Sequence, residues 1–214
     1  MRIWVMARMI VLVLAAGALP AQQTVQGTAK QAAKQTAADT ESLPAGYGSL
    51  RQDDIAVKVQ YNALQVRVLP LDERVIRTLS PDSYRTLHEL RESKRLSVDS
   101  VLRRTGLPGA SLWYVQFFNQ EQGEARFSPM ELVINSAGRD FRAVDLFALT
   151  PGFGEQRLRQ RDVQAALYVF DPSVDLDHAL TVTFETQSSD VWESLLAKVE
   201  RERALIRNRA GSKP

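Results

Sequence analysis

The stretch Ser111–Asn119, SLWYVQFFN, carries large apolar side chains at neighbouring as well as alternating positions. A strand covered on one face alternates between apolar and polar residues, whereas a strand in the middle of a packed sheet is apolar on both faces. We therefore expect this stretch to form a central strand. Its four aromatic residues also suit a sugar-stacking platform, but core packing is the interpretation that a central strand favours; they are Trp113, Tyr114, Phe117 and Phe118.

Strands with a period of two lie on both sides of this stretch. Upstream, the apolar residues of 57–61 and 64–68 alternate with polar or small ones, and 75–79 is expected to extend this edge. Downstream, strands are predicted at 130–135, 141–149, 163–170 and 180–184. Seven or eight strands at a spacing of about 10–15 residues, without alternating helices, favour an antiparallel β-sandwich. We assign it to residues 50–187.

Two helices interrupt this pattern before the central strand. Ser80-Pro81-Asp82 supplies an N-cap residue, a first-turn proline and an acidic residue, the usual beginning of a helix. A second helix is predicted at 97–105 and is ended by Gly106. The sequence therefore predicts a helical insertion at 80–106.

A C-terminal helix is predicted at 188–208, with Asp190 as its cap. One stripe of the helix is apolar at three-and-four spacing; it consists of Trp192, Leu195, Leu196, Val199 and Ile206. We expect this amphipathic helix to pack on the sandwich or on a partner subunit. Binding to a membrane surface is the alternative, and three acidic residues oppose it because such helices favour a cationic polar face; they are Glu193, Glu200 and Glu202.

Residues 1–21 have the order of a secretory signal peptide. Arg2 and Arg8 precede an apolar run at 9–18, and small residues follow. The run is shorter than the roughly 20 residues that span a bilayer, so we expect export with cleavage near Ala21 and no permanent membrane span. The compartment would be the periplasm or the extracellular space.

Residues 22–45 are rich in Ala, Gln and Thr and contain few large aliphatic side chains. Such a segment buries too little apolar surface to offset the entropy of ordering it. We therefore interpret 22–45 as a linker between the signal peptide and the folded domain.

Composition excludes several kinds of chemistry. The chain has no Cys and two His, which rules out disulfides, thiolate metal sites and a cysteine nucleophile, and no cofactor is predicted. The formal charge of +2 comes from Arg2 and Arg8, so the chain without residues 1–21 is formally neutral. A helix–turn–helix DNA reader at 80–106 would need a basic recognition stripe, which Arg103 and Arg104 alone do not make. We expect no nucleic-acid partner.

The region 127–185 contains an F-x-P segment (Phe127 and Pro129), a strand, a glycine turn at Gly138 and a strand ending in V-F at Phe170, before a final strand. In this order it resembles secreted bacterial immunoglobulin-like domains of unknown function, of the DUF4352 type found in lipoproteins. The resemblance implies an immunoglobulin-like antiparallel β-sandwich and a noncatalytic envelope module, and it supplies no active-site residues. This chain departs from that group in lacking a lipid-bearing Cys and in carrying the helical insertion.

Arg157, Arg159 and Arg161 alternate along the chain, so a strand here would place three guanidinium groups on one face, about 6.6–6.8 Å apart. Such a face can bind a phosphate, an anionic lipid head group or an acidic glycan. The alternative is an exposed sheet face whose cations meet carboxylates such as Glu131 or Asp145. This row is the predicted ligand-binding site.

The loop 171–178 places three aspartates within a short distance of chain and offers oxygen ligands for Ca²⁺. It does not match the EF-hand pattern, and a solvated loop is the simpler interpretation. His88 and His178 are candidates for a hydrolase with an assembled Ser/His/Asp site, although no G-x-S-x-G, H-E-x-x-H or P-loop motif is present.

These observations favour a noncatalytic binding or interaction module of the cell envelope over an enzyme. The expected partner is another envelope protein, or an anionic envelope polymer bound by Arg157, Arg159 and Arg161. A hydrolase and a small-ligand carrier, with a cavity between sheet and helices, are the alternatives.

Overall fold

The computed structural model describes residues 43–211, which belong to one compact unit. The predicted signal peptide and most of the predicted linker lie outside the described residues. The end of the linker belongs to the folded unit, because Leu43 is buried and its carbonyl accepts a hydrogen bond from Arg77 Nη1 at 2.9 Å.

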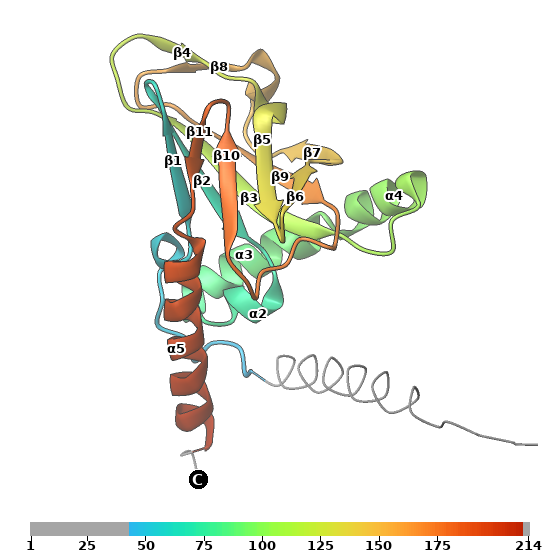
Figure 1. Cartoon of the computed structure of the whole chain (residues 1–214), viewed down its shortest axis with the longest axis vertical. Helices are drawn as coiled ribbons and strands as arrows, with labels where there is room; N and C mark the ends of the chain where they lie inside the picture. The colour runs from blue at the N-terminus through green and yellow to red at the C-terminus, as the bar shows by residue number, and fades with distance from the viewer. Residues whose placement is uncertain (1–42, 212–214) are drawn as a thin grey trace, which may run out of the picture. The chain divides into compact units, whose positions relative to one another are not determined.

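The larger of two sheets has five antiparallel strands in the order β1-β2-β3-β9-β7 (Figure 1). Its strands are β1 (Val57–Tyr61), β2 (Leu64–Pro70), β3 (Ser111–Asn119), β9 (Val163–Phe170) and β7 (Asp145–Ala148). The predicted central strand is confirmed, since β3 lies between β2 and β9 and pairs with β9 from Ser111↔Phe170 to Phe118↔Val163.

A second antiparallel sheet has the order β11-β10-β5-β6. It contains β11 (Gln187–Ser189), β10 (Leu180–Phe184), β5 (Leu132–Ser136) and β6 (Arg139–Arg142). Ala137 and Gly138 both have positive φ in the tight turn that joins β5 to β6, where only glycine adopts this backbone without a steric cost. A two-stranded ribbon, β4 (Glu124–Arg126) with β8 (Arg157–Arg159), completes the strands of the described residues.

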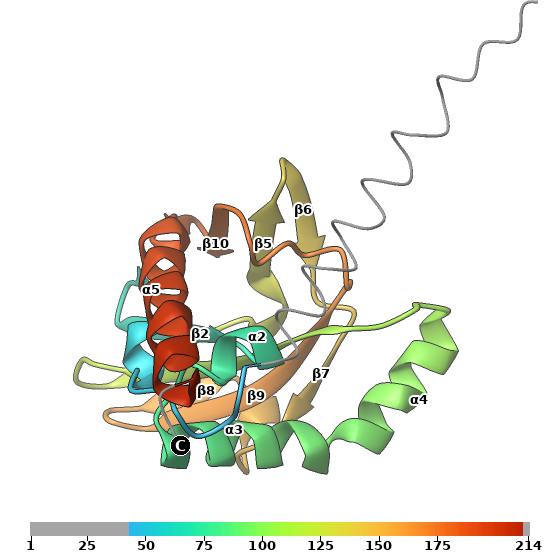
Figure 2. The ribbon, with the colours of Figure 1, turned by 90° about the horizontal axis from the view of Figure 1, so that it is seen from below.

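The two faces of β3 and β9 meet different neighbours. Trp113 and Phe117 are fully buried toward the four-stranded sheet, where the Phe117 ring centroid lies 5.6 Å from that of Phe184 on β10. On the opposite face, Leu112 and Val169 form an apolar cluster with residues of α4. Figure 2 shows α3 and α4 on one side of the five-stranded sheet, with β5 and β10 on the other. Core packing of Trp113 and Phe117 is therefore confirmed.

The helical insertion agrees with the sequence. It consists of α3 (Pro81–Ser93) and α4 (Arg95–Thr105), and Gly106 ends α4 with a left-handed backbone at φ 70°. One prediction before it is wrong: residues 75–79 do not extend the edge of the sheet. Asp72 instead caps a short helix, α2 (Glu73–Ile76), by accepting a hydrogen bond from Arg74 N, and a cap of this kind favours a helical turn over a strand.

The predicted strand at 141–149 is also divided. Phe141 belongs to β6 of the four-stranded sheet, whereas β7 pairs with β9 in the five-stranded sheet. The chain passes between the sheets at Ala143 and Val144, and Val144 N donates to Val169 O at 2.7 Å. Periodicity alone does not reveal such a crossing, because a period of two does not show which sheet a strand joins.

The C-terminal helix α5 (Trp192–Gly211) presents the predicted apolar stripe to the rest of the unit. Trp192 is fully buried, its ring centroid lies 6.4 Å from that of Trp113, and its Nε1 donates to Leu176 O at 3.1 Å. The stripe also includes two buried charged residues, Glu202 and Arg203, which the sequence pattern did not predict. None of the helices within residues 43–211 is long and apolar enough to cross a membrane.

Glu202 and Arg203 are buried because each finds partners on the N-terminal part of the unit. Glu202 Oε1 accepts hydrogen bonds from Ser49 N and Oγ, both at 2.9 Å, and from Arg209 Nη1 at 2.8 Å. Arg203 donates to the carbonyl of Arg74 on α2 at 2.9 and 3.1 Å. A buried charge without a partner costs free energy, so these contacts favour the observed position of α5 on the unit.

Replacing Trp192 with Ala should lower the free energy of unfolding by about 3–5 kcal/mol, because the change removes a buried ring and leaves a cavity against Trp113. Urea denaturation followed by far-UV circular dichroism measures this loss. Val191→Ala is the matched control: Val191 is 41% exposed, and its truncation should cost less than about 0.5 kcal/mol. Equal effects of the two changes would contradict the assignment of Trp192 as the anchor of α5.

Candidate functional site

Two of the three predicted site residues lie on the short ribbon β4–β8. In its register, Arg157 is opposite Arg126 and Arg159 is opposite Glu124. Residues two apart in a strand, and residues opposite one another, share a face, so these four charged side chains are on one side of the ribbon. On the other side, Leu158 is fully buried and Ala125 half-buried.

Arg161 does not continue this row. It lies in the turn after β8 with φ 64°, in the left-handed region, so the strand periodicity that would align it with Arg157 and Arg159 has ended. Asp162 closes the turn: its Oδ2 accepts a hydrogen bond from Arg159 N at 3.1 Å. The prediction of three aligned arginines on one strand is therefore wrong in this member.

Arg126 takes the third place on the face. The sequence did not predict β4, since a strand of three residues leaves almost no periodic signal. Its pairing with β8, about thirty positions along the chain, is decided by tertiary structure. The alternation of Glu124 and Arg126 was the one available signal. We define the arginine face as Arg126, Arg157 and Arg159.

Two buried amide side chains hold the ribbon against the sheet. Asn119, at the end of β3, donates through Nδ2 to Gly123 O and Leu158 O, both at 3.0 Å. It therefore contacts the backbone just before β4 and the backbone of β8. Gln164 on β9 donates through Nε2 to Gly152 O at 3.2 Å and Arg157 O at 3.0 Å. The ribbon is therefore placed by the ends of the two central strands.

The arginine face is incompletely neutralised. Glu124 lies 3.8 Å from Arg126 and 3.7 Å from Arg157, too far for hydrogen bonds, and the guanidinium of Arg159 has no ion-pair partner within residues 43–211. Like charges directly opposite one another destabilise a strand pair. Two carboxylates expected as partners bind elsewhere, Glu131 near Arg142 and Asp145 to Arg104. The face therefore keeps positive charge.

A cleft of about 420 Å³ opens beside this face. Its lining includes Arg126 and Arg157 from the ribbon, Glu155 before β8, Glu185 in the β10–β11 turn and Tyr61 at the end of β1. Figure 1 shows the ribbon β4–β8 and the β10–β11 turn at the same end of the unit. The volume is in the range that holds a small ligand or a few residues of a peptide.

The backbone that lines this cleft is strained. Asn62, Gln156 and Glu185 line it and have φ of 50°, 55° and 53°; they are three of the five non-glycine residues with positive φ in the described part of the chain. Such conformations cost about 1–3 kcal/mol each and are concentrated at ligand-binding positions. Asn62 and Glu185 each begin a two-residue hairpin turn, which uses this backbone, so the turns that line the cleft have a defined conformation.

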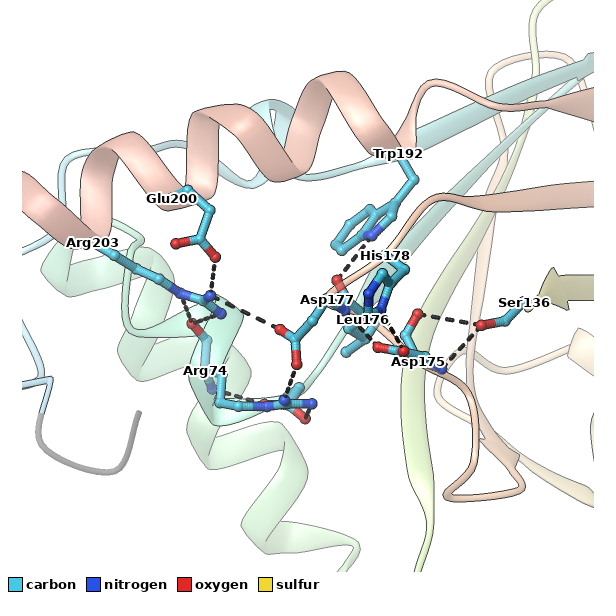
Figure 3. A network of polar contacts seen from close by, with 10 residues as sticks. Arg74, Ser136, Asp175, Leu176, Asp177, His178, Trp192, Glu200 and Arg203 are labelled. Atoms are coloured by element: carbon cyan, nitrogen blue, oxygen red, sulfur yellow. Dashed lines mark hydrogen bonds and ion pairs between the residues drawn. The ribbon is translucent and has the colours of Figure 1, made fainter. Parts of the chain in front are cut away.

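The acidic loop 171–178 is part of a different network, shown in Figure 3. Asp177 accepts a hydrogen bond from Arg74 Nη1 at 2.6 Å and lies 4.0 Å from Arg203 of α5. Asp171 and Asp175 accept hydrogen bonds from backbone N–H groups of the loop. Across residues 43–211 no group of three acidic or histidine side chains is placed to hold a metal ion, so the Ca²⁺ interpretation gains no support from this geometry.

Neither histidine meets a serine. His178 Nδ1 lies 2.6 Å from Asp175 Oδ2, but the nearby Ser136 Oγ is hydrogen-bonded to the backbone of Asp175 (Figure 3). Although partial burial raises it, the pKa of Asp175 lies below its ordinary value because Asp177 N–H and His178 stabilise the carboxylate. The dyad orients the loop, and the described residues do not assemble a Ser/His/Asp site around it.

His88 belongs to a cluster centred on Glu73 of α2. Glu73 accepts hydrogen bonds from Arg77 Nε at 2.9 Å and pairs with His88 Nδ1 at 2.8 Å, and Arg91 lies 3.4 Å away. Burial raises the pKa of Glu73, but these partners outweigh it and hold the pKa below its ordinary value. The cluster joins α2 to α3 and has the character of a structural ion-pair network.

No protein-family model, curated protein or solved structure matches this chain. The candidate site consequently stands on its geometry and charge.

Glu73→Gln should destabilise the protein by about 1–3 kcal/mol at neutral pH, because a partly buried carboxylate bonded to cations is lost. Since the folded-state pKa of Glu73 is lowered, its contribution is present above the ordinary value of 4.5 and is lost as the pH falls below it. Urea denaturation across this pH range should show a weaker acid dependence in the variant. The exposed Glu89, changed to Gln, is the control and should alter neither quantity.

Proposed function

We propose that this protein is an exported, noncatalytic binding module of the cell envelope, and that its contact surface is the arginine face with the adjoining cleft. The observation that carries the proposal is the set of three guanidinium groups on one side of the β4–β8 ribbon, with one carboxylate near two of them at distances beyond hydrogen bonding. Arginine in this state is ready to bind carboxylate or phosphate groups bidentately.

An immunoglobulin-like β-sandwich is the fold that we propose for the unit. Its support is the antiparallel arrangement of both sheets and the contact of Phe117 on β3 with Phe184 on β10. In sandwiches of this class the turns gather at the two ends, and binding surfaces are built from them. The cleft occupies such an end, since its lining comes from the β1–β2 and β10–β11 turns and from the ribbon.

The partner is proposed to be another protein of the envelope or an anionic envelope polymer. Export would be directed by residues 1–21, and this expectation rests on the sequence alone. A binding role agrees with the contacts of the two histidines. His88 pairs with Glu73 and His178 with Asp175, and both carboxylates also accept hydrogen bonds from other residues of the fold.

A small-ligand carrier is a second candidate that one observation favours. A cleft of about 390 Å³ lies between α3 and the five-stranded sheet, with Leu87, Leu90, Tyr114 and Leu149 in its lining. Its mainly apolar side chains suit an apolar ligand. A fluorescent apolar probe displaced by an envelope lipid extract would identify this activity, and Leu90→Trp should block it.

The triple change Arg126→Gln, Arg157→Gln and Arg159→Gln tests the binding role. Because it removes the charged contact groups and leaves Leu158 and the ribbon backbone intact, we expect a normal fold and a loss of partner capture of at least about tenfold. Capture is measured by chemical crosslinking in intact cells. The amount of the crosslinked product that the wild type forms is then quantified by mass spectrometry in the wild type and in the variant.

The matched control removes the same charge elsewhere. Arg103, Arg201 and Arg207 are exposed on α4 and α5 and have no ion pair within the described residues. Their replacement by Gln should leave capture unchanged. Equal loss in the two triple variants, or full capture by the ribbon variant, would reject the arginine face as the contact surface.

A further inference from the structure

The cleft beside the arginine face carries charges of both signs. Arg126 and Arg157 line it from the ribbon, and Glu155 and Glu185 line it from the η3 turn (Phe153–Glu155) and the β10–β11 turn. Within residues 43–211 neither of these two carboxylates has a hydrogen bond or an ion pair. Two cations and two anions therefore face one space without neutralising each other through direct contact.

This arrangement disfavours a ligand of one charge sign. A polyanion attracted by Arg126 and Arg157 meets Glu155 and Glu185, and like charges brought together in a partly enclosed site cost binding free energy. A polycation attracted by Glu155 and Glu185 is repelled in the same way by Arg126 and Arg157. The ligand that matches the cleft carries a carboxylate for the arginine pair and an ammonium or guanidinium group for the two glutamates.

The remaining lining distinguishes a peptide from a sugar. Sugar sites usually offer an exposed aromatic face, but Phe127 is buried and stacked on Phe117 at a centroid distance of 4.4 Å, and Tyr61 is half-buried with its ring packed at 82° to Phe184. Asn62, Gln156 and Ser128 instead supply amide and hydroxyl groups. Such groups hydrogen-bond the N–H and C=O groups of an extended polypeptide.

We infer that the cleft binds a peptide segment of a partner protein that carries acidic and basic side chains close together. The inference rests on the proposed binding role of the same surface and narrows its partner to a protein. In the bound state the acidic side chain lies against Arg126 and Arg157, and the basic one against Glu155 and Glu185. Asn62, Gln156 and Glu185 hold their left-handed backbone in the free protein, so the turns of the cleft are already formed before binding.

Fluorescently labelled peptides of equal length test this inference by anisotropy with the purified full chain. The probes are repeats of Glu-Lys, of Glu alone, of Lys alone and of Gly-Ser. We expect the Glu-Lys peptide to bind with a Kd at least about tenfold lower than that of either single-sign peptide, with no binding of the Gly-Ser peptide.

Charge-removing variants give changes of opposite direction, which a structural defect does not produce. Glu155→Gln with Glu185→Gln should weaken the Glu-Lys peptide about tenfold and strengthen the poly-Glu peptide. Arg126→Gln with Arg157→Gln should weaken the Glu-Lys peptide and strengthen the poly-Lys peptide. Glu89→Gln with Glu193→Gln, at two exposed helical positions, is the control and should change none of them. Glu185→Gly replaces the first change if Gln at φ 53° impairs folding, because glycine adopts that backbone freely.

The outcomes separate this inference from the proposed function. Binding of poly-Glu as tightly as the Glu-Lys peptide overturns the inference and leaves an anionic polymer as the partner. Absence of binding by every peptide, or variant effects in one direction only, also overturns it. The proposed binding role fails separately, when the ribbon triple variant retains full capture in cells.

Discussion

The pairing of β3 with β9 is the constraint on which the rest of the structure depends. Eight residue pairs run from Ser111↔Phe170 to Phe118↔Val163, and every residue of β9 except Val163 is buried. A strand pair covered on both faces needs two further layers to exclude water. The four-stranded sheet supplies one layer through Phe184, and α3 and α4 supply the other. The helical insertion therefore serves the fold as a cover for the sheet.

The polar ends of the same two strands place the candidate site. Asn119 ends β3 and Gln164 lies near the start of β9, and both are at least nine-tenths buried with their amides bonded to the ribbon backbone. A buried amide that lost these partners would cost free energy, so the hydrogen bonds stabilise this position of the ribbon. The arginine face is consequently presented on a ribbon that is hydrogen-bonded to the ends of β3 and β9.

Buried polar contacts also place α5 against the N-terminal part of the unit. Glu202 of α5 accepts hydrogen bonds from Ser49. Arg203 donates to the carbonyl of Arg74 and pairs with Glu200 (Figure 3). Of the three acidic residues that oppose a membrane-surface helix, Glu202 is buried in the folded unit, and Glu200 is exposed and paired with Arg203. The sequence pattern did not predict the buried position of Glu202, because a glutamate in an amphipathic helix is ordinarily solvent-exposed.

Sequence patterns predicted the features that depend on neighbouring residues. Periodicities and caps that act over a few residues predicted the strands at 57–61 and 64–68, the central strand, the helical insertion at 80–106 and the apolar stripe of α5, and the structure confirms them. The predictions for export, partner and immunoglobulin-like topology remain predictions. Three predictions were wrong: residues 75 and 76 lie in the capped helix α2, 141–149 divides between two sheets, and Arg161 lies in a turn after the strand. A period of two in the sequence does not register a helix cap, a crossing between sheets or the end of a strand.

Local patterns were enough to predict a mainly β chain with a helical insertion, a C-terminal helix and a charged stretch at 157–161, because side-chain period and turn chemistry are local properties. Only the tertiary structure decided which charges share a surface. Arg126 shares a face with Arg157 and Arg159 because three residue pairs form the ribbon. Glu155 and Glu185, which belong to different turns, line the same cleft. Arg126 and Glu185 are about thirty positions from residues 155–159, and hydrogen bonds from the buried side chains of Asn119 and Gln164 place the ribbon on the sheet. A site of this kind is set by packing, which no local pattern encodes.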